Sequence, residues 1–92
     1  MELQRLGIVV QGKVQGVGFR FFTAHCARGY HITGWVCNRP DNSVEMEVQG
    51  SPEQLHVFRT EINQGPLLAR VHDLRIVELP IVADEAGFDI RY

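Results

Sequence analysis

The sequence predicts an α+β fold, because segments with the two-residue period of strands alternate with segments that have the three- and four-residue period of helices. Two helical patterns, each followed by glycine, separate the groups of strand patterns. The predicted order is strand, helix, strand, strand, helix, strand and a short closing strand, which is the split βαβ arrangement of ferredoxin-like folds. We therefore expect a βαββαβ sandwich, with an antiparallel or mixed sheet of four to five strands and two helices on one face.

Five segments have the pattern of strands. The first is apolar on one face and nearly apolar on the other, which is typical of a central strand. The third alternates apolar residues with glutamates and a glutamine, which predicts one exposed face. The fourth is long, and we expect its apolar anchors at Val71, Ile76 and Val77. The five predicted strands span residues 6–10, 32–38, 44–49, 69–79 and 88–92.

Two segments have the pattern of helices. Residues 19–30 place large apolar side chains on one face, and a glycine near their end is expected to stop the helix. The second helix should begin at Ser51, with Pro52 at its first position and Gln54 completing a capping box. A Gly-Pro pair should end it. The buried face of this second helix is predicted to contain Leu55, Phe58 and Ile62.

The predicted topology has a consequence for the position of two loops. In a split βαβ fold the first and second strands run parallel, with the third strand between them. Their carboxyl ends then lie at the same edge of the sheet, where ligands often bind in open α/β layers. The loop after Gln11 and the residue Asn38 are therefore expected to meet there.

Length, charge and cysteine content exclude several classes of protein. We expect residues 1–92 to form a single domain, too short for separate cofactor and substrate domains. The net charge of −2 argues against a nucleic-acid partner, which usually meets a basic face. No cysteine or histidine spacing is typical of a zinc site, and no segment is typical of a signal peptide or a membrane span. We expect a cytoplasmic monomer without metal or cofactor.

A glycine-rich loop precedes the first predicted helix. Glycines at positions 12, 16 and 18 let the backbone bring N–H groups close to an anion, and the helix start adds unpaired N–H donors. Arg20 follows, and its guanidinium can bind a phosphate through two parallel hydrogen bonds. The pattern indicates a small phosphate site, and it is neither a Walker A loop nor a Rossmann fingerprint. Alternatively, the glycines only form a tight turn, with Arg20 as a surface charge.

The motifs along the chain resemble those of acylphosphatases. Residues 12–20 read GKVQGVGFR, similar to the phosphate loop of that family, G-x-V-Q-G-V-x-F-R. Residues 34–38 read GWVCN, similar to the second block of the family, G-W-V-x-N. Residues 44–50 resemble the third strand of the family, and residues 88–92, FDIRY, resemble its F-x-I-R-Y ending. The resemblance covers nearly the whole chain in the order of the family.

The resemblance implies an activity and a role for individual residues. The activity is hydrolysis of the carboxyl–phosphate bond of small acyl phosphates, with no metal and no phosphoenzyme. Arg20 would hold the phosphate and stabilise its charge in the transition state, and Asn38 would orient the attacking water. Gly12 and Thr23 would support the site. The backbone that would bind the phosphoryl oxygens comprises Gln15, Gly16, Val17, Gly18, Phe19 and Arg20.

Two alternatives remain beside this reading. The chain also resembles the acylphosphatase-like domain of hydrogenase-maturation carbamoyltransferases, but those domains usually have proline where Phe21 stands. A non-catalytic domain that only binds phosphates or acyl phosphates is the second alternative, and it would not need the amide of Asn38. Arg39 also departs from the family, which more often has threonine or an apolar residue there.

Several other residues have structural interpretations. We expect Trp35 to pack against the first helix and both cysteines to be small core residues. The four histidines are scattered and imply no metal site or nucleophile. An RNA-binding role is discounted because the central strands present no pair of exposed aromatic residues. The residues considered for that platform are Leu6, Ile8, Val44 and Met46.

Overall fold

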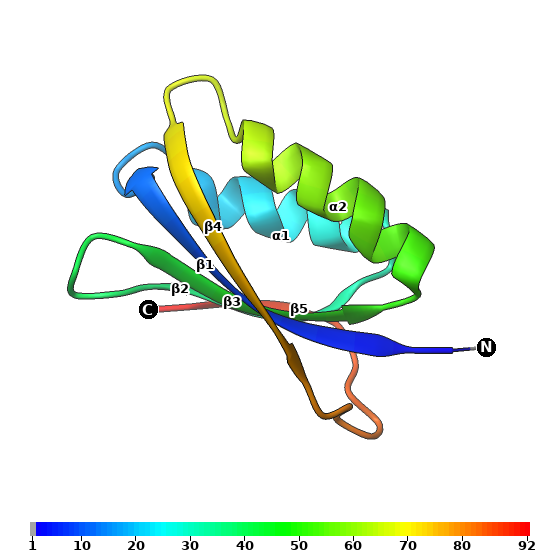
Figure 1. Ribbon diagram of the computed structural model, residues 1–92. Coiled ribbons are helices and arrows are strands. Elements are labelled where there is room, and N and C mark those ends of the chain that lie inside the picture. The colour runs from blue at the N-terminus through cyan, green and yellow to red at the C-terminus, as the bar shows by residue number, and fades with distance from the viewer. Residues whose placement is uncertain (1) are drawn as a thin grey trace.

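The computed structural model describes residues 2–92 and confirms the predicted βαββαβ order with a fifth, closing strand. The five strands form one sheet in the order β4-β1-β3-β2-β5, and both helices lie on one face of it (Figure 1). The elements are β1 (Gln4–Lys13), α1 (Phe19–Gly29), β2 (Thr33–Asn38), β3 (Val44–Gly50), α2 (Pro52–Gln64), β4 (Arg70–Leu79) and β5 (Phe88–Arg91).

The pairing of the central strands confirms the geometry on which the predicted site depends. β3 lies between β1 and β2 and pairs antiparallel with both, so β1 and β2 run parallel to each other. β4 pairs antiparallel with the other side of β1, and β5 pairs parallel with β2. The carboxyl ends of β1 and β2 therefore lie at the same edge of the sheet.

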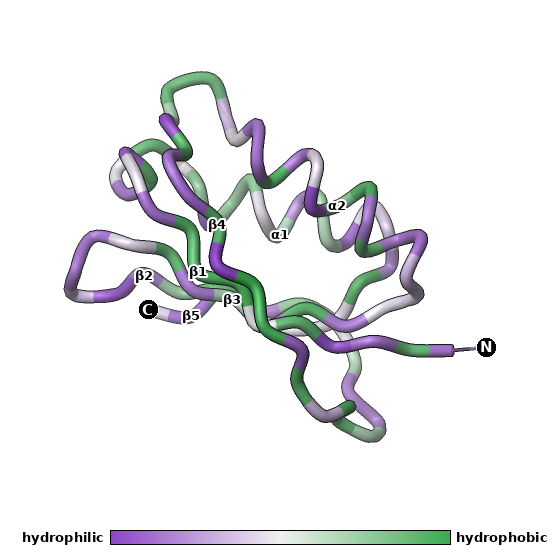
Figure 2. Tube along the Cα trace, viewed as in Figure 1, coloured by the Kyte–Doolittle hydropathy of each residue, from purple (hydrophilic) through white to green (hydrophobic). Residues whose placement is uncertain are grey.

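The core lies between the helices and one face of the sheet. Alternate residues of β1 and β3 are buried there, as the strand periodicity predicts. The helices contribute their apolar faces, and Figure 2 shows the alternation of hydrophilic and hydrophobic residues along α2. Each large apolar side chain buried in this way contributes about 1.5–3 kcal/mol. The core residues from the strands and helices include Leu6, Ile8, Val10, Val44, Met46, Val48, Phe19, Leu55, Phe58 and Ile62.

The second helix begins as the sequence predicts. The side chain of Ser51 accepts a hydrogen bond from the backbone N–H of Gln54, at 3.2 Å. The Gln54 side chain accepts one from the backbone N–H of Ser51, at 2.9 Å, which completes the capping box. The helix ends at Gln64, and Gly65 follows with a φ of 71°. These local signals therefore fixed both ends of α2.

The prediction for the apolar anchors of β4 is wrong at one position. Val77 is 59% exposed on the helix-free face, whereas Leu74 and Ile76 pack against the core. Val71 also packs there, although it lies three residues before Leu74. The reason is a β-bulge beside β1, since Gln11 pairs with Asp73 but the next residue pairs with Val71. A bulge shifts the alternation of faces, which a simple two-residue period does not anticipate.

Two interpretations of the sheet faces also need correction. Trp35 is not in the core beneath α1. It lies beside Glu47 of β3, and the Arg91 guanidinium carbon is 4.6 Å from the centre of its ring. The exclusion of an RNA platform needs no correction, because the residues considered for it are buried under the helices. Gln49, expected on the exposed face of β3, is only 5% exposed.

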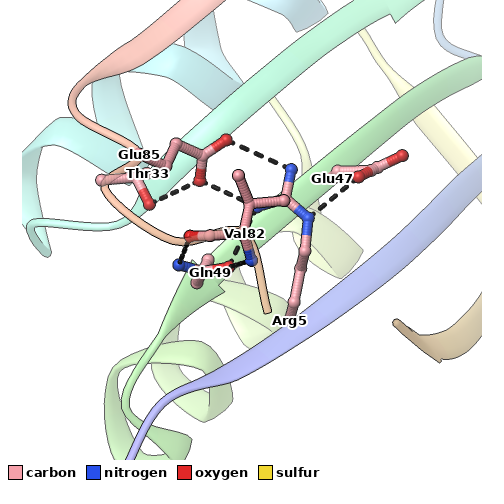
Figure 3. Close-up of polar contacts among 6 residues, drawn as sticks. All are labelled: Arg5, Thr33, Glu47, Gln49, Val82 and Glu85. Carbon is pink, nitrogen blue, oxygen red and sulfur yellow. Dashed lines mark hydrogen bonds and ion pairs between the residues drawn. The ribbon is translucent and has the colours of Figure 1, made fainter. Parts of the chain in front are cut away.

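Gln49 is covered by the segment between β4 and β5, which a buried arginine helps to hold on the sheet. Arg5 is 2% exposed, and its Nε donates to Glu47 at 2.9 Å (Figure 3). Its two terminal nitrogens donate to the Glu85 carboxylate at 2.8 and 3.2 Å. Gln49 exchanges two hydrogen bonds with the backbone of Val82, at 2.9 and 3.0 Å. The segment between β4 and β5 is thus attached to the helix-free face of the sheet.

The Arg5–Glu85 pair makes stability depend on pH. Burial alone would raise the pKa of Glu85, but hydrogen bonds from Arg5 and Thr33 and the charge of Arg5 lower it below its usual 4.5. A carboxylate with a lowered folded-state pKa stabilises the fold above its unfolded-state pKa. That contribution is lost as the pH falls through the folded-state value.

We predict that Glu85→Ala lowers the free energy of unfolding by about 3 kcal/mol at pH 7, because it leaves Arg5 buried with one carboxylate fewer. The difference from the unsubstituted chain should shrink as the pH falls below about 4.5, where the Glu85 carboxylate of the unfolded chain becomes protonated. Urea unfolding at pH 7 and pH 3 measures both effects. Glu78→Ala, at an exposed position of β4, is the control and should change stability little. A pH-independent difference for Glu85→Ala would contradict the role of the ion pair.

Candidate functional site

The loop between β1 and α1 is formed by residues 14–18. Gly16 and Gly18 have φ values of 73° and 76°, in the left-handed region that favours glycine. Gly18 is the N-cap of α1, and no side chain caps this helix. The first turn also contains no acidic residue. The N–H groups at the start of α1 are therefore free of side-chain partners and can bind an anion, which the helix dipole favours.

Gly12 lies in β1, so the loop begins later than the sequence suggests. Its φ is 133°, and a Cβ atom there would lie 2.0 Å from the carbonyl oxygen of Arg70 in β4. No side chain fits in that space. Gly12 therefore allows β4 to approach β1 at the bulge, and it supports the site only through the sheet.

A pocket of about 120 Å³ lies where this loop meets the end of β2. Arg20 and Asn38, which belong to different elements, both line it. A larger hollow of about 410 Å³ lies between α2 and β4, but no glycine loop or helix N-terminus borders it. The residues that line the smaller pocket are Val14, Gly16, Gly18, Phe19, Arg20, Phe21 and Asn38.

The guanidinium of Arg20 is oriented by the C-terminal residues. Its Nη1 donates to the carbonyl oxygen of Arg91 at 3.3 Å. Its Cζ lies 4.6 Å from the centre of the Tyr92 ring, a cation–π contact. A guanidinium carries five N–H donors, so this one hydrogen bond leaves others for a ligand. The Arg20 guanidinium is therefore held in place while most of its N–H donors remain available to a ligand.

Asn38 is the last residue of β2, and its side chain is exposed at the pocket. Positive charges gather around this end of the strand. Burial and, less strongly, the Glu45 carboxylate raise the pKa of the Cys37 thiol. Three guanidinium groups act on that thiol in the opposite direction, those of Arg91, Arg39 and Arg20. The edge of the sheet that holds the pocket is thus locally basic, in a chain with a net charge of −2.

Four residues assigned to the site by sequence do not line the pocket, namely Gly12 of β1 and three others. The Gln15 amide nitrogen points to the turn between β2 and β3, where it donates to two carbonyl oxygens at 2.8 Å each. Val17 packs against the core. Thr23 is fully buried in α1, and its hydroxyl has no partner among the described residues. Gln15 and Val17 could reach a ligand at this pocket through their backbone alone.

The structure adds residues that the sequence analysis did not assign to the site. Val14 and Phe21 line the pocket, and the C-terminal pair Arg91 and Tyr92 contacts the arginine that lines it. Phe21 adjoins Arg20 in sequence, which is the one signal that could have indicated it. The C-terminal pair carries no such local signal, because only the parallel pairing of β5 with β2 brings it here.

Within residues 2–92, the cysteines and the possible metal ligands form no second cluster. Both cysteines are free thiols, and burial with the nearby Glu61 carboxylate raises the pKa of Cys26 to about 11. Among residues 2–92, no group of three or more histidine, cysteine, aspartate or glutamate residues is placed to hold a metal ion. Neither helix of the described chain has the length and apolar composition needed to cross a membrane.

Comparison with known proteins identifies close relatives. A family model described as Acylphosphatase matches residues 6–90. An acylphosphatase of Geobacillus kaustophilus is 42% identical over 90 residues, covering 98% of this chain and 96% of its own. The crystal structure of acylphosphatase from Bacillus subtilis superimposes with a TM-score of 0.93 at 34% identity, covering 99% and 100% of the two chains. Full-length HypF, in a phosphate- and nucleotide-bound form, matches with a TM-score of 0.87 at 29% identity, over 99% of this chain and 12% of that one.

We predict that alanine at Gly12 and alanine at Gly18 have different effects. Gly12→Ala should lower the melting temperature strongly, because its Cβ would overlap the Arg70 carbonyl. Gly18→Ala meets no atom within 4 Å but strains a φ of 76°, so the fold should survive while inorganic phosphate binds more weakly. Thermal unfolding and phosphate titration by calorimetry test this pair. Unchanged phosphate binding by Gly18→Ala would contradict an anion site at this loop.

Proposed function

This chain belongs to the acylphosphatase family and hydrolyses acyl phosphates to a carboxylate and inorganic phosphate, and we propose that water attacks the phosphorus directly at the pocket between α1 and β2. The observation that carries this mechanism is the convergence of Arg20, Asn38 and the uncapped start of α1 on one pocket. That combination supplies a phosphate clamp and a water-binding amide side by side.

The phosphate group is held by backbone and by one cation. The N–H groups from Gln15 to Arg20 bind its oxygens, aided by the partial positive charge at the start of α1. Arg20 donates further hydrogen bonds and stabilises the charge that spreads over the phosphoryl oxygens in the transition state. Its contacts with Arg91 and Tyr92 set the guanidinium before substrate arrives. Such preorganised donors need little rearrangement during the reaction.

Asn38 orients the nucleophile. Its side chain is exposed at the pocket, where it can bind a water through its amide. Attack requires that water to lie in line with the bond to the leaving group. The leaving carboxylate needs no proton near neutral pH, because free carboxylic acids have pKa values near 4. Positioning and electrostatics therefore suffice for this chemistry, without a metal or a general acid.

The wider setting of the enzyme is part of this proposal. Residues 1–92 would form one domain that works as a cytoplasmic monomer, without a nucleic-acid partner. Gly12 and Thr23 would support the site from the sheet and from α1. The pocket is small, so it would accommodate the phosphoryl group and leave the acyl group at its open mouth.

A second candidate is a domain that handles carbamoyl phosphate in hydrogenase maturation, as the resemblance to the carbamoyltransferase domains implies, and the structural match to HypF is the observation that keeps it. Its identity of 29% is lower than the 42% shared with the Geobacillus acylphosphatase. A domain that only binds phosphates is a third candidate. It would need the arginine and the loop but not an amide at the pocket, so the placement of Asn38 supports catalysis instead.

We predict that Arg20→Lys loses most of the activity while the fold is retained. Lysine keeps the charge but cannot make two parallel hydrogen bonds to a phosphate. Turnover on benzoyl phosphate, followed by ultraviolet absorbance, should fall, and the inhibition constant for inorganic phosphate should rise. Arg59→Lys, an exposed arginine of α2, is the control and should behave like the unsubstituted chain. Normal kinetics in Arg20→Lys would remove Arg20 as the phosphate clamp.

We predict that Asn38→Ala slows turnover with little change in phosphate binding. Loss of one well-placed donor costs about 2.7–4 kcal/mol of barrier, or roughly 100- to 1000-fold in rate, in oxyanion sites that offer a comparison. The measurement compares turnover on benzoyl phosphate with the inhibition constant for phosphate, with circular dichroism to confirm folding. Equal losses in binding and turnover would recast Asn38 as a substrate-binding residue, and unchanged turnover would exclude it from the mechanism.

A further inference from the structure

We propose that the side chain of Gln15 is a positioning residue for hydrolysis, which holds the turn after Asn38 at a fixed distance from the phosphate loop. The inference rests on the proposed role of Asn38 as the residue that orients water. It assigns to Gln15 a function separate from any contact of its backbone with phosphate.

The contacts of Gln15 link two segments that are otherwise separate loops. Its Nε2 donates to the carbonyl oxygen of Arg39 and to that of Ser43, both at 2.8 Å. These oxygens lie at the two ends of the turn between β2 and β3. The same oxygens accept the hydrogen bonds of the turn itself, Asn42 N–H to Arg39 at 3.2 Å and Arg39 N–H to Ser43 at 2.9 Å. The amide group of Gln15 thus joins both ends of the turn to the loop between β1 and α1.

The end of β2 is attached to the sheet on one side only. The parallel pairing with β5 ends at Cys37, so Asn38 is paired on one side only, with Val44 of β3. Asn38 is exposed, and the turn that follows contains Asn42 with a φ of 73°. A displacement of about 1 Å in a reacting group can cost on the order of 100-fold in rate. The Gln15 bonds restrain the residue next to Asn38 against such a displacement.

The geometry also separates this role from phosphate binding. An amide NH₂ group has two donors, and both donors of Gln15 are engaged by carbonyl oxygens. The remaining oxygen of the amide is an acceptor and would repel a phosphate oxygen. The side chain of Gln15 does not line the pocket, which Arg20 and Asn38 share. Gln15 therefore acts on the reaction through the turn.

The test begins with Gln15→Met, which keeps the length of the side chain and removes both donors. Turnover on benzoyl phosphate should fall by about tenfold to about 100-fold, with the inhibition constant for inorganic phosphate changed by less than about twofold. In the Asn38→Ala background the same substitution should cause almost no further loss, because it acts through Asn38. Gln64→Met is the control, because it makes the same change at an exposed position of α2, and turnover should be nearly unchanged.

A second variant keeps the test decisive if Gln15→Met folds poorly. In Gln15→Glu, an ionised carboxylate would face two carbonyl oxygens, whereas a protonated one can donate to one of them. Turnover relative to the unsubstituted chain should therefore rise as the pH falls through the pKa of the new carboxyl group. A flat pH dependence of that ratio would overturn the proposal.

Three kinetic results would also overturn it. A phosphate inhibition constant that rises in proportion to the loss of turnover would mean that Gln15 binds phosphate. If Asn38→Ala is slow and the double variant loses turnover by the product of the two single losses, Gln15 acts independently of Asn38. That result would overturn the positioning role of Gln15 but not the proposed role of Asn38. Full turnover by Asn38→Ala would instead overturn the proposed role of Asn38 and this inference with it.

Discussion

The site of this protein depends on one constraint, the burial of β3 between β1 and β2 beneath the two helices. Antiparallel pairing on both sides of β3 makes its neighbours parallel, so the end of β1 and the end of β2 must meet at one edge. The apolar residues of β1 and β3 fix this arrangement, because a shift of one residue would turn them to the helix-free face. The loop between β1 and α1 and Asn38 are thus brought together by the packing of the core.

Polar contacts then fix the positions of segments that lie outside the core. The Arg5 network holds the segment between β4 and β5 on the helix-free face, so that the chain can cross from one edge of the sheet to the other (Figures 1 and 3). That crossing delivers Arg91 and Tyr92 to the guanidinium of Arg20. A buried charge of this kind is costly unless it is fully paired, which is why Arg5 has two carboxylates.

The proposed site combines local positive charge with a chain that is acidic overall. The uncapped start of α1 and several guanidinium groups oppose the net charge of −2 at one edge of the sheet. A chain of 92 residues has little interior in which to enclose a substrate, and acyl phosphate chemistry does not demand much enclosure. In the proposed mechanism, donors held in place before the substrate binds are sufficient, and they would come from the backbone, from Arg20 and from Asn38.

The sequence by itself determined the element order, both ends of α2, the parallel relation of β1 and β2, and the meeting of the glycine-rich loop with Asn38, because these follow from local periodicity, capping and topology. Only the tertiary structure decided which face Trp35 and Val77 occupy, since a bulge and a cation–π contact depend on neighbouring strands. It also decided that Gly12 allows β4 to approach β1 closely and that the Gln15 side chain donates to the turn between β2 and β3. Such contacts join residues distant in sequence, and no local pattern encodes them.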